Sequence, residues 1–214
     1  MDRLELLASL AKGSKCLCDV GCDHAYAIIK AIKNYGVERG IAADINEGPL
    51  GQARLKLTEA GLLDKVDIAL SDGFKAIDKP FDTVIIAGMG GILIKSIIEA
   101  ALDKLGDKRL ILEPNSDAPL LRAFLGSNGF KIIEEHAIID MGKYYEIMVV
   151  VPGEASYSDL EIKYGPILIR ERPEAYKRHY EAMIKHLESL IDKIKKEDIR
   201  ASKLNQISEL KKII

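Results

Sequence analysis

The fold of this chain of 214 residues is decided by the stretch KCLCDVGCDHAY at residues 15–26. Its apolar first half predicts a strand, and a helix is expected from about Ala25 to Asn34. Gly21 lies at the turn between them, where a residue without a side chain lets the backbone approach a bound cofactor. Asp23 and His24 stand where a dinucleotide-binding turn would have its second glycine. The stretch therefore predicts both a cofactor cradle and a candidate group for chemistry.

Short apolar runs alternate with helical stretches from here to about residue 150. Strands are expected at 15–20, 40–44, 66–70, 81–87 and 109–113, and a closing hairpin at 130–133 and 145–151. Helices are expected between them, and Pro114 should stop the fifth strand as Gly126 should end the helix of 118–125. The alternation predicts an α/β fold with a doubly wound parallel sheet and helices on both faces. Ligands of such sheets bind outside the carboxyl ends of the strands.

Polar loops follow the expected strands at that edge. Asp44 ends the second strand and can accept hydrogen bonds from both hydroxyls of a ribose. The carboxylate of Asp72, after the third strand, could accept a hydrogen bond from an adenine amino group. The glycines of 88–91 allow close backbone approach and leave free amides at the start of a helix. Each loop alone has a structural reading, as a helix cap, a packing loop or an exposed turn.

Together, acids after the first three strands without a GxGxxG turn favour S-adenosylmethionine over NAD as the cofactor. The residues predicted to bind it lie at the strand ends: Asp19, Gly21, Asp44, Ile45, Asp72, Gly73, Gly88, Met89 and Gly90. A fifth polar loop, Glu113-Pro114-Asn115-Ser116, follows the fifth strand.

The composition is that of a globular protein, with 48% hydrophobic and 30% charged residues. No apolar run reaches the roughly 20 residues of a membrane span, and the N-terminus lacks a signal pattern, so we expect a cytoplasmic protein. The net charge of −2 argues against binding nucleic acid by bulk charge. Residues 1–150 carry 18 basic and 22 acidic side chains, whereas the remainder is net basic.

Three cysteines, Cys16, Cys18 and Cys22, fall within seven residues. Together with His24 they could suggest a metal site. Alternate residues of a strand share a face, however, so Cys16 and Cys18 should point to one side while the chain turns before Cys22. Buried free thiols are therefore the preferred interpretation, and no metal site is predicted.

The pattern changes at Pro152-Gly153-Glu154, which divides a domain of residues 1–152 from an appendage of residues 153–214. A helix is expected from Pro173. Its apolar residues have the four-three spacing of a two-helix seam, namely Tyr176, Tyr180, Met183, Leu187, Leu190 and Ile194. A second amphipathic segment carries Leu204, Ile207, Leu210 and Ile214. An antiparallel helical hairpin is the simplest packing of the two.

Six motifs, in this order along the chain, resemble those of the bacterial TrmK family: DVGCDHAY (19–26), AADINEGPLGQA (42–53), SDGF (71–74), IIAGMGG (85–91), LILEPN (110–115) and GKYYEI (142–147). The resemblance implies a Rossmann-like class I methyltransferase sheet with a C-terminal coiled-coil appendage. It also implies methylation of adenine N1 at position 22, in the D arm of tRNA. This chain departs from the family at Cys22, at Glu113, where glutamine is frequent, and in lacking a proline in the turn after Tyr26.

For such a reaction, Asp23 is the candidate for stabilising the positive charge that develops on the adenine ring. His24 and Tyr26 would orient Asp23 or the base, and Asn115 resembles a base-contacting residue. Stacking on the base would need Tyr26, Tyr144 or Tyr145. Phosphate contacts are expected from basic residues of the appendage: Lys163, Arg170, Arg172, Lys177, Arg178 and Lys185.

The expected partner is tRNA, with no membrane and no protein partner, and the expected oligomeric state is a monomer. Two other classes stay open. A small-molecule methyltransferase would share the cofactor loops, but the basic appendage would be hard to explain. An RNA-binding protein without activity would have little reason to keep Asp44, Asp72 and the glycine loop together.

Overall fold

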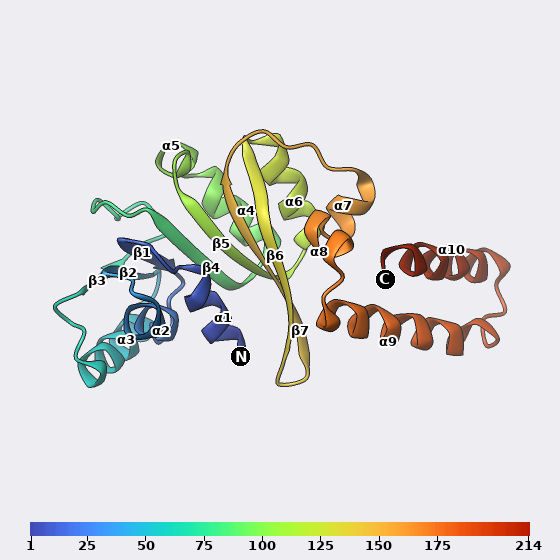
Figure 1. Cartoon of the computed structure of the whole chain (residues 1–214), viewed down its shortest axis with the longest axis horizontal. Coiled ribbons are helices and arrows are strands. Elements are labelled where there is room, and N and C mark those ends of the chain that lie inside the picture. The colour runs from blue at the N-terminus through green and yellow to red at the C-terminus, as the bar shows by residue number, and fades with distance from the viewer.

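A seven-stranded sheet with helices on both faces forms the body of the computed structural model, which describes all 214 residues (Figure 1). The strands are β1 (Cys16–Val20), β2 (Arg39–Asp44), β3 (Val66–Leu70), β4 (Thr83–Gly90), β5 (Arg109–Ser116), β6 (Phe130–Asp140) and β7 (Lys143–Pro152). Their order in the sheet is β3-β2-β1-β4-β5-β7-β6. Strands β1 to β5 are parallel, and β7 is antiparallel to both of its neighbours. The predicted α/β sheet is confirmed.

Ten helices accompany these strands. They are α1 (Arg3–Leu10), α2 (Tyr26–Tyr35), α3 (Glu47–Ala60), α4 (Gly91–Glu99), α5 (Leu102–Leu105), α6 (Ala118–Ser127), α7 (Asp159–Tyr164), α8 (Pro166–Glu171), α9 (Glu174–Ile191) and α10 (Glu197–Ile213). None of them is both long and apolar enough to span a membrane.

Both faces of the sheet are covered, which explains the near-continuous apolar run of β4. Val84 and Ile86 face a core shared with α4, α5 and α6, whereas Ile85 between them faces a core shared with α1, α2 and α3. Such alternation is what a strand buried on both sides requires. Cys18 lies in the first core and Cys22 in the second, so the predicted separation of the cysteines is confirmed.

Two predicted stops are wrong. Strand β5 continues through Pro114 to Ser116, because the ladder with β4 is already irregular beside Met89 and β7 pairs only with residues 110–112. Helix α6 continues through Gly126 to Ser127. A Cβ on Gly126 would lie 3.2 Å from the Tyr157 ring, so this glycine makes room for a neighbour instead of ending the helix.

Strand β6 is much longer than predicted and bends at a register shift between Ile132 and Glu134. Charged residues interrupt its apolar pattern, which is why the sequence indicates only its first four residues. One of these charged residues, Glu135, is buried. The β6–β7 turn lies at the carboxyl edge of the sheet, because β6 runs parallel to β5.

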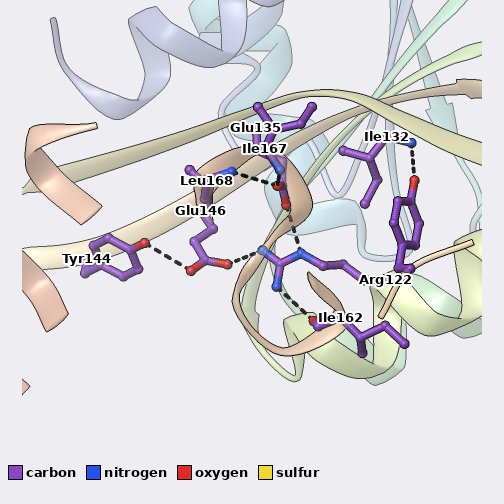
Figure 2. Close-up of polar contacts among 9 residues, drawn as sticks. Arg122, Ile132, Glu135, Tyr144, Glu146, Ile162, Ile167 and Leu168 are labelled. Atoms are coloured by element: carbon purple, nitrogen blue, oxygen red, sulfur yellow. Dashed lines mark hydrogen bonds and ion pairs between the residues drawn. The ribbon is translucent and has the colours of Figure 1, made fainter. Parts of the chain in front are cut away.

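Glu135 belongs to a buried ionic network around Arg122 of α6, shown in Figure 2. Nε of Arg122 lies 2.8 Å from Glu135, and Nη2 lies 2.5 Å from Glu146 of β7. Glu135 also accepts hydrogen bonds from the amides of Ile167 and Leu168 at the start of α8. The network therefore fastens α8, which the sequence pattern did not predict, to the sheet.

Helices α9 and α10 form the predicted hairpin, which projects from the side of the sheet (Figure 1). Their buried stripe differs from the predicted seam: it contains Tyr176, Tyr180, Ile184, Leu187 and Ile191 of α9, and Ile207, Leu210 and Ile213 of α10. The four-three pattern shifts because the first turns of α9 pack on Tyr164 of α7 as well as on α10. Leu204, predicted to be in the seam, is 48% exposed.

Candidate active site

A cavity of about 500 Å³ opens at the carboxyl ends of β1 to β4. The sequence-predicted site residues that line it are Asp19, Gly21, Asp23, His24, Tyr26, Asp44, Ile45, Asp72, Gly73, Gly88 and Met89. These side chains and turns come from four strand ends that are adjacent in the sheet. The structure therefore brings together all but two of the residues predicted from the sequence.

The turn after β1 has an unusual backbone. Gly21 has φ of +78°, and two residues with side chains, Asp23 and Ala25, also have positive φ, at +47° and +57°. The amides of Gly21 and Cys22 both donate to the carbonyl of Ala43 at the end of β2, which holds the turn in place. Left-handed conformations of residues other than glycine cost energy and are frequent at functional sites.

Gly21 is also needed for space. A Cβ at this position would lie 2.1 Å from Cε of Met89, so only glycine lets the Met89 side chain lie against the turn. The end of β4 and the turn after β1 are therefore in direct contact at the cavity. Gly88, also with positive φ (+78°), leaves its surroundings open within 4 Å.

The acids at the ends of β1 and β2 are both buried. Asp19 is 5% exposed, and its burial, together with the charges of Asp44 and Asp23, raises its pKa to about 7. Oδ1 of Asp44 accepts a hydrogen bond from the amide of Asn46 at 2.9 Å. Oδ2 of Asp44 accepts none from the protein, so it is available to a ligand hydroxyl.

Asp72 is more exposed than Asp19 and Asp44. It lies 2.6 Å from Lys75 in the next turn, so a ligand amine would compete with that lysine. The loop itself is well ordered by Ser71, whose hydroxyl donates to the carbonyl of Gly73 and accepts from the amide of Ala76.

Asp23, His24 and Tyr26 lie together at the mouth of the cavity. Nε2 of His24 is 3.4 Å from Oδ1 of Asp23, and the His24 ring lies 5.5 Å from the Tyr26 ring. Nδ1 of His24 is buried without a hydrogen-bond partner. The Asp23 side chain is 73% exposed, so its carboxylate can reach a substrate that covers the mouth.

Asn115 and Gly90 do not line the cavity. Nδ2 of Asn115 donates to the carbonyl of Gly88 at 2.7 Å, which holds this exposed amide beside the end of β4 and leaves its Oδ1 free. Gly90 is the residue before α4, and a Cβ there would lie 3.1 Å from Oγ of Ser116. The expectation that Gly90 lines the pocket is therefore wrong, because this residue faces the β5 loop.

The sequence reasoning missed Arg3 and Leu4 of α1, which also line the cavity. Nη1 of Arg3 lies 2.5 Å from Glu113, whose side chain is fully buried. The signal for α1 was present: Asp2 caps the helix by accepting a hydrogen bond from the amide of Glu5, an Asp-x-x-Glu pattern. The other lining residues that were missed are Val20, Cys22, Ala27, Asn46, Ser71, Ala87, Leu93 and Ile97.

Cys22 is buried in the lining. Desolvation and the neighbouring charge of Asp19 raise the pKa of its thiol well above the usual value. It therefore carries no thiolate near neutral pH and acts as a small apolar residue of the core.

Comparison with known proteins gives one consistent set of relatives. The TrmK family model, described as tRNA (adenine(22)-N(1))-methyltransferase, matches residues 17–213. The Bacillus subtilis (strain 168) tRNA (adenine(22)-N(1))-methyltransferase is 35% identical over 178 residues, which cover 79% of this chain and 75% of the relative.

Two solved structures have the same fold over nearly the whole chain. Streptococcus pneumoniae Sp1610 in complex with S-adenosyl-L-methionine superposes with a TM-score of 0.88 at 33% identity, covering 100% of this chain and 99% of the other. TrmK of M. capricolum in complex with S-adenosyl-homocysteine superposes with a TM-score of 0.83 at 26% identity, covering 98% and 95%.

Proposed function

This chain belongs to the tRNA (adenine(22)-N(1))-methyltransferase family, and we propose that the cavity at the ends of β1 to β4 is where it methylates N1 of adenine 22 in the D arm of tRNA. The observation that carries the proposal is the gathering of Asp19, Asp44 and the two glycine turns around one cavity. The family and the Rossmann-like methyltransferase sheet are as the resemblance implies. The coiled-coil character of the C-terminal hairpin stays a prediction.

The residues of the cavity fit S-adenosylmethionine. Its volume of about 500 Å³ is within the range of pockets for ligands of this size. The open surroundings of Gly88, where a Cβ would meet nothing within 4 Å, allow the ligand to lie against the backbone. The free Oδ2 of Asp44 suits a ribose hydroxyl, and Asp72 suits an adenine amine once Lys75 is displaced. Ile45 would pack beside the adenine, and Gly73 would leave room for it.

When bound, this cofactor supplies an electrophilic methyl group on a sulfonium. The protein supplies alignment and electrostatic stabilisation. Asp19 is available to a cationic part of the cofactor, because such a partner would stabilise its ionised form. The backbone of Gly88 and Met89 would line the point of transfer.

Adenine N1 has an in-plane lone pair, so the base can attack without first losing a proton, and the ring gains positive charge as the bond forms. Asp23, at the mouth, would stabilise this charge near the exocyclic amine and accept its proton afterwards. His24 and Tyr26 would hold Asp23 and the base in position. Asn115, whose Nδ2 is engaged by Gly88, would accept from the amine with Oδ1.

Adenine N1 lies on the base-pairing edge, so a paired base must leave its helix to react. Of the three tyrosines considered for stacking, Tyr26 is the one that is exposed and lines the cavity. Tyr144 instead stacks on His179 of α9, with ring centroids 3.9 Å apart, and Tyr145 lies beside Arg3. We therefore assign the stacking role to Tyr26.

The appendage of residues 153–214 would bind tRNA, and the six basic residues expected to contact phosphates fall into two groups in the structure. Lys163 pairs with Glu209 and Arg170 with Glu171, and Arg172 bonds to backbone carbonyls. The second group forms no ion pair and lies exposed on α9: Lys177, Arg178 and Lys185. The second group is the better candidate for phosphate contacts, since no internal partner must be displaced.

We propose that the enzyme works as a monomer without a protein partner. We also propose that it acts in the cytoplasm, on tRNA as the substrate. Light scattering of the purified protein, with and without tRNA, tests the oligomeric state.

The function is tested with methyl-labelled S-adenosylmethionine and unmodified tRNA transcripts that carry either adenine or guanine at position 22. The expected result is 1-methyladenosine in the first transcript and no label in the second. Label in small molecules alone would favour a small-molecule methyltransferase. Binding of tRNA without any transfer would favour a non-catalytic RNA-binding protein.

A further inference from the structure

Arg3 is the only arginine or lysine among the residues that line the cavity. Four aspartates line the same cavity: Asp19, Asp23, Asp44 and Asp72. S-adenosylmethionine has two positive groups, the sulfonium and the α-ammonium, and one negative group, the α-carboxylate. Four carboxylates attract the two cations and repel the α-carboxylate, which therefore needs a cationic partner of its own.

Contacts from three strands hold Arg3 in place. Its Nη1 lies 2.5 Å from Oε2 of Glu113 on β5, and its Cζ lies 5.1 Å from the ring centroid of Tyr145 on β7. Its backbone amide donates to Asp140 at the end of β6, at 3.3 Å. Strands β5, β7 and β6 lie on one side of β4, and β1 to β3 lie on the other. Arg3 is therefore at the end of the cavity opposite to Asp72.

The direction of the cofactor follows from the proposed function, on which this inference rests. Asp72 follows β3 and Asp44 ends β2, so the adenine and the ribose occupy that end of the cavity. The methionine part then extends past β1 and β4, toward Arg3.

We propose that Arg3 binds the α-carboxylate of the methionine part of S-adenosylmethionine. The Nε and Nη2 groups of Arg3 donate to no protein atom, so the guanidinium has donors left for a second carboxylate. Glu113 holds the guanidinium through Nη1. The Glu113 side chain is fully buried, Arg3 is its one hydrogen-bond partner, and its Oε1 has no partner. A contact made by the third residue of the chain thus closes the methionine end of the site.

The test compares two ligands that share the nucleoside. S-adenosylhomocysteine has the α-carboxylate, and 5′-methylthioadenosine lacks the whole amino-acid part. Calorimetry is done with the wild type and with Arg3→Gln. It is also done with Arg3→Gln/Glu113→Gln, because Arg3→Gln alone leaves a buried carboxylate unpaired. The matched control is Arg39→Gln, which removes an exposed arginine at the start of β2, on the opposite edge of the sheet.

Both Arg3 variants are expected to bind S-adenosylhomocysteine about tenfold to a hundredfold more weakly and 5′-methylthioadenosine as the wild type does. Arg39→Gln should change neither affinity. Unchanged binding of S-adenosylhomocysteine overturns the inference, including the case in which only tRNA affinity falls, which would make Arg3 a phosphate contact. An equal loss for both ligands also overturns it and leaves Arg3 a structural role. A wild type that binds no S-adenosylhomocysteine contradicts the proposed function itself.

Discussion

Asp19 is buried beside two further acids in the lining of the cavity, and its pKa of about 7 has a consequence for stability. The ordinary pKa is 3.8, so the folded state binds the proton more tightly than the unfolded state does. The free energy of unfolding of the ligand-free protein therefore falls as pH rises from about 4 to about 7, and the loss is complete above that range. The destabilisation is of the order of a few kcal/mol.

Asp19→Asn, which cannot ionise, should therefore stabilise the ligand-free protein at pH 8 and much less at pH 5. We expect a difference in Tm from the wild type of roughly 5–10 °C at pH 8, measured by calorimetric scans at both pH values. The exposed Asp64→Asn is the control, with no pH-dependent difference. Equal differences at pH 5 and pH 8 would contradict this explanation.

Asp23 is tested most sharply by Asp23→Asn. Asparagine tolerates the left-handed backbone at this position (φ +47°) better than alanine does, so the turn is kept while the charge is removed. Methylation of tRNA should fall by about a hundredfold or more, since general acid–base groups contribute at least that much. Affinity for S-adenosylhomocysteine should change little, because the Asp23 side chain lies at the mouth. A variant with near-normal turnover would remove Asp23 from the mechanism.

Among the elements, the β4–α4 turn depends on a close contact with the loop after β5. A Cβ on Gly91 would lie 2.6 Å from the carbonyl oxygen of Asp117 and 2.8 Å from that of Ser116, both of them backbone atoms. Gly91→Ala should therefore lower stability by about 1–3 kcal/mol and shift the loop that carries Gly88 and Met89. Denaturant unfolding and cofactor titration measure the two effects.

The control for Gly91 is Gly51→Ala in α3, where a Cβ would meet nothing within 4 Å. There, alanine should stabilise by up to about 1 kcal/mol. If both variants behaved alike, the contact with Asp117 would not be what requires glycine at position 91.

The individual strands differ in how well hydrophobic periodicity predicts them. Strands β1 to β4 follow from apolar runs with turn residues at their ends, because the burial of a parallel strand leaves that pattern. The extent of β6 does not follow from such a pattern, because Glu135 is buried in an ion pair with Arg122 of α6. No local sequence pattern indicates that a charge is neutralised by a residue of another element. Pro114 likewise indicates the end of a strand. The irregular ladder beside Met89, which allows β5 to continue through this proline, is seen only in the structure.

For the whole molecule, the site residues that could be predicted are those that lie at the end of a strand or directly after it. The shared edge of a parallel sheet brings Asp19, Asp44 and Gly88 together whatever the details of packing. Arg3 could not be predicted this way, because its partner Glu113 lies 110 positions away and the contact exists only after α1 docks on β5 and β7. Long-range side-chain pairs of this kind need the structure.

The position of the α9–α10 hairpin relative to the cavity is also a property of the whole molecule. Tyr144 of β7 stacks on His179 of α9 and donates to Glu146 of the Arg122 network (Figure 2), so α9 is attached beside the β6–β7 hairpin. That hairpin turns at the same edge of the sheet as the cavity, where its Asp140 meets α1. A tRNA bound along α9 therefore has the cavity within reach on the same side of the protein.

The unpaired cations of α9 test this arrangement. Lys177, Arg178 and Lys185 are one, seven and eight residues apart, which puts them on one face of the helix. Replacing all three with glutamine should weaken tRNA binding by about tenfold or more at low salt and reduce its salt dependence, since fewer counterions are released. Affinity for S-adenosylhomocysteine should not change. Filter binding over a series of salt concentrations measures the first effect, and calorimetry the second.

The matched control removes three exposed lysines at the opposite edge of the sheet, Lys12, Lys33 and Lys65, which form no ion pair either. This triple variant has the same change in net charge, so it reports the effect of bulk charge alone. If the two triple variants lost tRNA affinity equally, α9 would have no special part in binding. If α9 binds RNA beside the cavity, the α9 variant should lose more tRNA affinity than the control, with a reduced salt dependence and an unchanged cofactor affinity. The reason is that the two variants lose the same charge, so only a local phosphate contact can make their tRNA affinities differ.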